Sequence, residues 1–289
     1  MGCNTSSVGI QKKISDNVLI PLSTTDSSGI KESVTIQKHT EQFYESEAES
    51  SSADDASTTQ QTLSPSFLIN LAQTNILVME EKYEEKTKHG FVTMDFWKAV
   101  FSLSDQLEII LDHEPQSEKL DIMETLTQHF KDHHTVKILC YMCAEILEPG
   151  SNSKYPGIST QHIHFVSSLL SVLVNCSDNN VELCSIISKQ TNFLNTATKK
   201  LQQWKTPHFD VIDTKSEGGS HILESLITVL HNITMFEDNV PKVRDVNCIE
   251  AMKPYLESKD NTIRLLCLAT LADLVNESES EMIKTMVMS

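Results

Sequence analysis

From about residue 66 onward, apolar side chains recur at the spacing of amphipathic α-helices. Apolar residues fall at positions i, i+3 and i+4 in segments 66–79, 96–111, 119–126, 136–147 and 165–174. Strand signals are nearly absent, because strict alternation is rare and no Asn-Gly or Asp-Gly hairpin pair occurs. The pattern therefore predicts an all-α folded region.

Several helix starts are marked in the sequence. Asp260 is suited to cap the helix that follows it, and Pro241 is tolerated in a first helical turn. Residues 278–281, Ser-Glu-Ser-Glu, fit a capping box. Helices are therefore expected to begin at these three places.

The N-terminal part has a different composition. Residues 1–64 are rich in Ser, Thr, Glu, Asp and Gln, and the run 45–61 contains no large apolar residue. Such a segment buries too little apolar surface to offset the entropy lost on ordering. We expect a disordered tether over 1–64 and a folded helical domain over 65–289.

The first residues, Met-Gly-Cys-Asn-Thr-Ser, fit an N-myristoylation signal. Removal of Met1 exposes Gly2, and Ser6 supplies the hydroxyl of the M-G-x-x-x-[ST] pattern. One myristoyl chain binds a bilayer only marginally, so stable anchoring needs a second signal. Cys3 supplies it as a palmitoyl thioester. The alternative is an unmodified N-terminal tail.

Net charge, apolar runs and cysteine content indicate which partners and which cell compartment to expect. The formal net charge is −17, which argues against nucleic acid as a partner. No apolar run approaches the roughly 20 residues of a transmembrane helix, and the apolar core of a secretory signal is also lacking. The seven cysteines are scattered, mostly within apolar segments. We interpret this as a cytosolic protein without disulfides.

The last 120 or so residues contain an internal repeat. Segment 169–175, Leu-Leu-Ser-Val-Leu-Val-Asn, aligns with 226–232, Leu-Ile-Thr-Val-Leu-His-Asn, and 267–274 forms a third copy. The interval from Asn232 to Asp273 is 41 residues, whereas that from Asn175 to Asn232 is 57. Segment 204–219 contains Pro and Gly-Gly and is the expected insertion.

These repeats resemble the armadillo family. Segments 243–256, 257–260 and 263–274 match its first and second helices, its short turn and its third helix, and Asn247 stands at the corner usually made by Gly. The resemblance is clear over about 160–286 and weak over 66–158. It implies repeats that stack into a superhelix with a groove.

The resemblance also implies a set of groove residues. In armadillo proteins the Asn that ends the third helix hydrogen-bonds the backbone of an extended peptide, because its amide offers both donor and acceptor. Asn175, Asn232 and Asp273 occupy this position. They are alternatively polar helix ends that face water. Armadillo repeats that bind nuclear-import signals also carry a Trp four residues before this Asn. Here Ser171, Thr228 and Ala269 lie near that position. The groove is therefore as compatible with a helical or folded partner as with an extended peptide.

A zinc site is the other chemistry considered. Cys140 and Cys143 follow His129 and His133, which share one helical face. The cysteine pair lies within an apolar helix without a knuckle Gly, so structural cysteines and surface histidines are the better account. Signatures of catalytic Ser, zinc-protease, phosphate-loop and kinase sites are absent. No enzyme activity, metal or cofactor is expected.

The combined interpretation is a lipid-anchored armadillo-repeat adaptor on the cytosolic face of a membrane, which binds other proteins through its groove. The layout is similar to that of the acylated vacuolar armadillo protein of yeast. One alternative is the regulatory half of an architecture that joins armadillo-like repeats to a TIR domain. The other is a soluble helical-repeat binding protein without lipid.

Overall fold

The computed structural model describes residues 64–90, 92–112, 116–148, 160–204, 219–275 and 279. The chain divides into two units, Met1–Gln61 and Thr62–Ser289, and the described residues belong to the second. Gly2, Cys3 and the expected tether lie outside the described residues. So does most of the expected capping box at 278–281.

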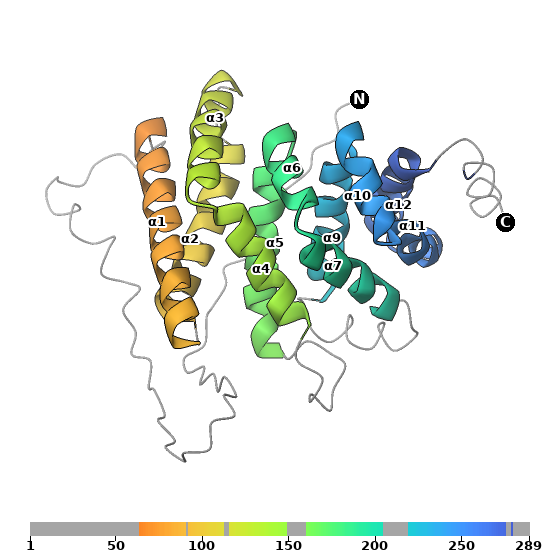
Figure 1. Ribbon diagram of the computed structural model, residues 1–289. Helices are drawn as coiled ribbons and strands as arrows, with labels where there is room; N and C mark the ends of the chain where they lie inside the picture. Colours follow the sequence, from red (N-terminus) through yellow and green to blue (C-terminus); the bar gives the residue numbers. More distant parts are fainter. Residues whose placement is uncertain are drawn as a thin grey trace, which may run out of the picture. The chain divides into compact units, whose positions relative to one another are not determined.

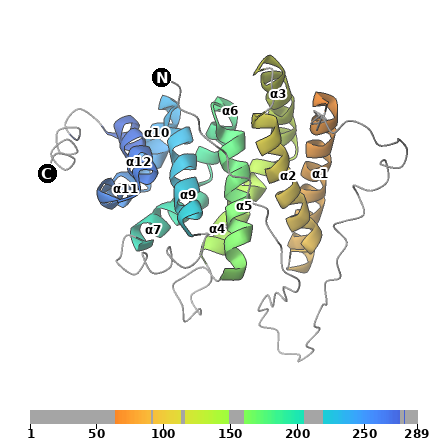
Figure 2. The ribbon, with the colours of Figure 1, turned by 180° about the vertical axis from the view of Figure 1, so that it is seen from behind.

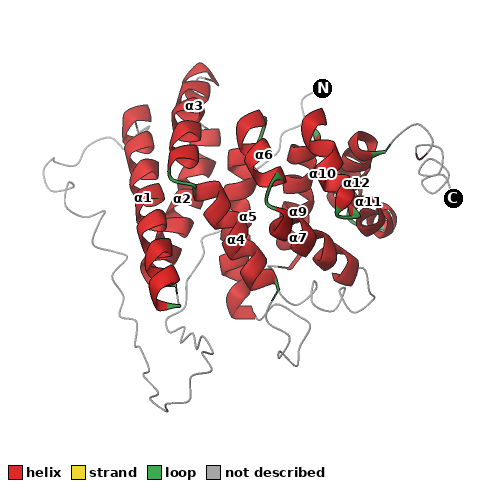
Figure 3. Ribbon diagram, in the orientation of Figure 1, coloured by secondary structure: helices red, strands yellow, loops and turns green. Residues whose placement is uncertain are grey.

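All regular elements in the described part of the chain are helices (Figure 3). The all-α prediction is confirmed. The expected insertion also falls between two helices, since α7 ends at Trp204 and α9 begins at Gly219. Residues 205–218 between them are outside the described ranges.

The helices form three layers that run along the unit in chain order (Figure 1). One layer, called here the third-helix layer, is a ladder in which each helix contacts the next: α2 (Met94–Leu111), α5 (Thr160–Ser177), α9 (Gly219–Thr234) and α12 (Asn261–Leu274). Figure 2 shows the same succession from behind.

The other two layers follow the same order. The second-helix layer consists of α1 (Pro65–His89), α4 (Thr135–Leu147), α7 (Thr191–Trp204) and α11 (Cys248–Met252), which continues as η2 (Lys253–Glu257). The first-helix layer consists of α3 (Gln116–Asp132), α6 (Val181–Ser188) and α10 (Val240–Asp245), which follows η1 (Glu237–Asn239). Three repeats have one helix from each layer, namely α3 to α5, α6 to α9 and α10 to α12, and α1 and α2 precede them as a pair in the described part of the chain.

Equivalent positions of the three C-terminal repeats are buried alike. Leu173, Leu230 and Leu271 are each 0% exposed. The residues four positions before them, Leu169, Leu226 and Cys267, are also 0% exposed. A residue so placed on the third helix loses its water contact only when the neighbouring repeats are stacked against it. The repeated sequence pattern therefore corresponds to side chains that are packed in the same way in each repeat.

Caps and corners explain where the helices begin. The Asp260 carboxylate accepts backbone N–H groups from Thr262 and Ile263 at 2.8 and 3.3 Å, which confirms the predicted cap of α12. Pro241 stands in the first turn of α10, as expected. Asn247 has a φ of 59° between α10 and α11, and His134 has a φ of 52° at the matching corner between α3 and α4. Asn tolerates this left-handed conformation better than most residues.

Polar contacts join α1, the first helix of the array, to its neighbours. Glu80 Oε2 lies 2.6 Å from His133 Nδ1, and Gln73 Nε2 lies 2.5 Å from His129 Nε2, both on or just after α3. Lys86 Nζ donates to Glu145 of α4 at 2.5 Å. These contacts hold α1 against α3 and α4.

None of the helices in the described ranges combines the length and apolar character that crossing a membrane requires.

Candidate protein-binding surface

The third-helix layer carries the residues that the sequence predicts for a binding groove. On α5 and α9, small polar side chains that alternate with the buried apolar positions are partly exposed. They include Ser168, Asn175, Ser225 and Thr228. Neighbouring helices of the layer therefore present short side chains at matching positions, which leaves the helix surface open to a partner.

Asn232 is the most enclosed of the predicted groove residues. Its side chain is buried, with the residue 6% exposed. The amide Nδ2 donates to Ser177 Oγ at 3.0 Å and to the Val174 carbonyl oxygen at 3.3 Å, both in the last turn of α5. Both amide hydrogens are thus engaged within the protein. Asn232 joins two repeats, and its amide donors are not available to a partner in this arrangement.

Asp273 makes the corresponding contact one repeat later. Its Oδ2 lies 3.4 Å from the hydroxyl of Thr234 and 3.7 Å from Nδ1 of His231, both at the end of α9. Its side chain is about one-third exposed. The carboxylate therefore joins α12 to α9 while still facing solvent.

Asn175 differs from both. It is partly exposed, and its side chain makes no hydrogen bond with another residue in the described part of the chain. The preceding helix of the layer, α2, ends in Ile109, Ile110 and Leu111, which offer no hydroxyl. Asn175 therefore has the free donor and acceptor that a partner backbone needs.

The sequence contains a second signal for these repeat-joining contacts, apart from the third-helix Asn. Ser177 and Thr234 each come two residues after a third-helix Asn, and each is at most 2% exposed. A hydroxyl in this position accepts from, or donates to, the Asn or Asp of the next repeat. The predicted trio thus separates into one open position, Asn175, and two repeat contacts, Asn232 and Asp273.

Carboxylates add negative charge to the layer. Glu108 of α2 and Asp178 after α5 are exposed, and Glu224 of α9 is partly exposed. Together with Asp273 they favour a partner that brings basic or hydrogen-bond-donating groups. This charge agrees with the strongly acidic character of the whole chain.

The residues considered for zinc are used in packing. Cys140 and Cys143 are 1% and 0% exposed within α4, and burial raises the pKa of both thiols. His129 and His133 contact α1 through Gln73 and Glu80. Within the described ranges, no group of three or more His, Cys, Asp or Glu side chains is placed to hold a metal ion. The six described cysteines are free thiols.

Comparison with known proteins gives similarity at the level of structure only. No protein-family model matches the chain, and no curated protein matches it. A designed armadillo repeat protein is similar with a TM-score of 0.39 and 11% identity, over 76% of this chain and 96% of that one. An engineered protein is similar with a TM-score of 0.39 and 13% identity, over 74% and 85% of the two chains.

The fold is an armadillo-like helical repeat. This assignment rests on the order of the helices, the three layers and the recurring buried positions at Leu173, Leu230 and Leu271.

Proposed function

We propose that this chain is an armadillo-like adaptor that binds another protein through its third-helix layer and is held at the cytosolic face of a membrane by acyl chains on Gly2 and Cys3. The observation that supports binding most strongly is the open row of short polar side chains on α5 and α9, with Asn175 unpaired among the described residues. Stacked helical repeats expose a long continuous surface, and such surfaces are typically used for binding proteins.

The proposal assigns no reaction to the protein. The described cysteines are buried, and burial raises the pKa of Cys184, Cys248 and Cys267 to about 12, so few of these thiols ionise at neutral pH. The polar residues of the third-helix layer are suited to hydrogen bonding with a partner. We therefore assign the surface to recognition and not to catalysis.

The binding surface is tested by adding bulk and charge to it. Asn175→Arg with Thr228→Arg puts two long cationic side chains on α5 and α9, and we expect it to weaken partner capture by at least about tenfold. Proximity labelling by the full chain in cells measures this capture. The matched control is Thr191→Arg with Asn195→Arg, two exposed positions of α7 in the second-helix layer. Equal loss in both variants would contradict the assignment.

Membrane anchoring is supported by the Met-Gly-Cys sequence at the start of the chain. A single acyl chain binds a membrane only weakly, so stable anchoring needs a second acyl chain, which Cys3 can carry. Gly2→Ala removes the myristoylation site, and we expect it to abolish labelling by alkyne-myristate and to move the protein out of the membrane fraction. Cys3→Ser should keep the myristate label but lower the membrane-bound share.

These two variants separate the alternatives. Equal myristate labelling of the wild type and Gly2→Ala would contradict acylation and favour a helical-repeat binding protein without lipid. If the wild type is labelled by myristate but both variants fractionate like the wild type, the acyl chains do not hold the protein at the membrane.

A further inference from the structure

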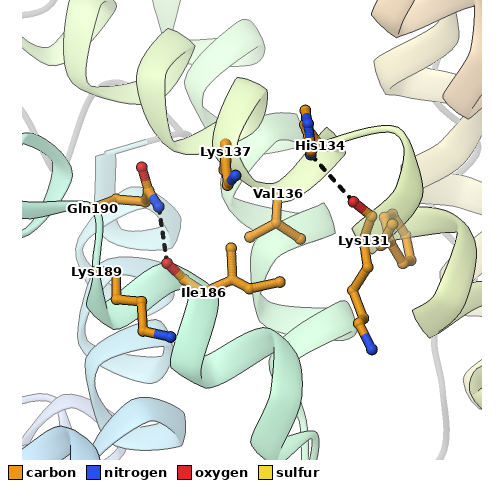
Figure 4. Close-up of a pocket in the computed structure, with 8 residues that line it drawn as sticks. Lys131, His134, Val136, Lys137, Ile186, Lys189 and Gln190 are labelled. Carbon is orange, nitrogen blue, oxygen red and sulfur yellow. Dashed lines mark hydrogen bonds between the residues drawn. The ribbon is translucent and has the colours of Figure 1, made fainter.

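A second surface lies away from the third-helix layer, where two neighbouring repeats meet. A cavity of about 310 Å³ opens between the end of α3, the start of α4 and the end of α6. Ile186 is the partly exposed apolar side chain of its lining, and the other two apolar lining residues, Phe130 and Val136, are 0% exposed beneath the surface. Figure 4 shows Val136 and Ile186 at the centre, with polar side chains around them. We call this cavity the lysine-rimmed pocket.

The rim of the pocket is basic in an otherwise acidic protein. Lys131, Lys137 and Lys189 line it together with His134, although the whole chain has a net charge of −17. The first of these lysines donates to Glu182 at 2.6 Å. Lys137 and Lys189 are exposed and form no ion pair with a carboxylate among the described residues. Two uncompensated ammonium groups therefore flank the partly exposed Ile186.

The helix geometry adds to this positive potential. Val136 and Lys137 belong to the first turn of α4, where backbone N–H groups lack helical partners and the helix dipole is positive. The side chains of the neighbouring residues are held in place, since His134 Nδ1 donates to the Lys131 carbonyl oxygen at 3.2 Å and Gln190 Nε2 donates to the Ile186 carbonyl oxygen at 3.0 Å. Figure 4 shows both hydrogen bonds on opposite sides of the pocket.

We propose that the lysine-rimmed pocket binds an acidic peptide segment of a partner protein, with one large apolar side chain packed on Ile186 and its flanking carboxylates paired with Lys137 and Lys189. The volume is at the small end of ligand pockets, which suits a single side chain. The partly exposed Ile186 distinguishes this occupant from a free anion, which gains nothing from contact with an apolar side chain. Charge complementarity selects an acidic segment over a basic one.

This surface is separate from the one in the proposed function. The pocket is built by the first-helix layer and the first turn of α4, whereas Asn175 and Thr228 belong to the third-helix layer. The protein would then hold two partners at once, one on each surface. Failure of one assignment leaves the other intact.

Fluorescence anisotropy with the full chain and short labelled peptides tests the proposal. The probe has one Phe between two runs of Glu, and we expect saturable binding that weakens with added salt. Lys137→Glu with Lys189→Glu should weaken binding by about tenfold. The matched control, Lys88→Glu with Lys259→Glu, makes the same charge change at exposed sites outside the pocket and should stay within about twofold. Replacing the Phe of the probe by Ala should weaken binding by about tenfold or more.

Three results would overturn the proposal. The first is equal weakening by the pocket pair and the control pair, which would show a general effect of charge. The second is a change in binding by Asn175→Arg with Thr228→Arg that exceeds the change made by the pocket pair, which would place the peptide on the third-helix layer. The third is binding of phosphatidylserine vesicles through Lys137 and Lys189 without any binding of the peptide, which would make the pocket a contact for lipid headgroups.

Discussion

Leu230→Ala is expected to lower the free energy of unfolding by about 2–5 kcal/mol, the range for removing a fully buried Leu side chain. Leu230 is 0% exposed on α9, and α9 packs between α5 and α12. The cavity left by the substitution opens inside the ladder, where helices on both sides are held by further contacts and cannot easily close in. Urea unfolding followed by circular dichroism measures the change.

The matched control is Leu265→Ala, the same truncation on the neighbouring helix α12. Leu265 is 62% exposed, so its side chain contributes little to the core. We expect a change within about 0.5 kcal/mol. Similar losses for the two variants would contradict the stacking of α9 against its neighbours, because burial would then make no difference to the cost.

Asn232→Ala is expected to destabilise the folded protein by about 2–3 kcal/mol. The substitution removes the hydrogen bonds to Ser177 Oγ and the Val174 carbonyl oxygen, and leaves polar atoms buried without those donors. Ser177 is 0% exposed, so water does not readily replace the lost amide. The same urea experiment measures the loss.

Asn175 provides the control for this prediction, because it ends the third helix of the preceding repeat. It is partly exposed and unpaired among the described residues, so Asn175→Ala should change stability by less than about 0.5 kcal/mol. The two substitutions thus distinguish a residue that joins repeats from one that is open to a partner. A large loss for Asn175→Ala with none for Asn232→Ala would reverse the roles given to them here.

Much of the C-terminal architecture could be predicted from the sequence. The 3.6-residue periodicity gave the helices, and the repeated third-helix ending gave the stacking of α5, α9 and α12, because the same apolar positions must be buried in each copy. Asn247 marked a corner that needs a positive φ, and it has one. These features depend on local propensity and on a pattern that recurs along the chain.

The place of α2 in the third-helix layer was harder to predict because α2 lacks that ending and uses aromatic packing in its place. Trp97 and Phe101 of α2 pack on Phe165 of α5, with ring centroids 4.2 and 5.8 Å apart. These contacts join residues more than 60 positions apart in sequence. The repeated sequence motif therefore does not identify α2 as a member of the third-helix layer.

The roles of Asn232 and the pocket lysines also depend on packing between repeats. The partner of the Asn232 amide lies 55 residues away, at Ser177. Lys137 and Lys189 are separated by a similar length of chain and meet at one pocket because α4 and α6 are neighbours. A pattern that places residues on one helix face says nothing of which neighbouring helix that face meets.

We propose that the third-helix layer is the surface that contacts a partner protein. Site-specific photo-cross-linking in cells tests it most directly, with a photoreactive amino acid placed at Asn175 of α5 or at Asn195, an exposed position of α7 in the second-helix layer. We expect a discrete cross-linked protein from position 175 and little from position 195. Equal capture from both positions, or capture from position 195 alone, would contradict it.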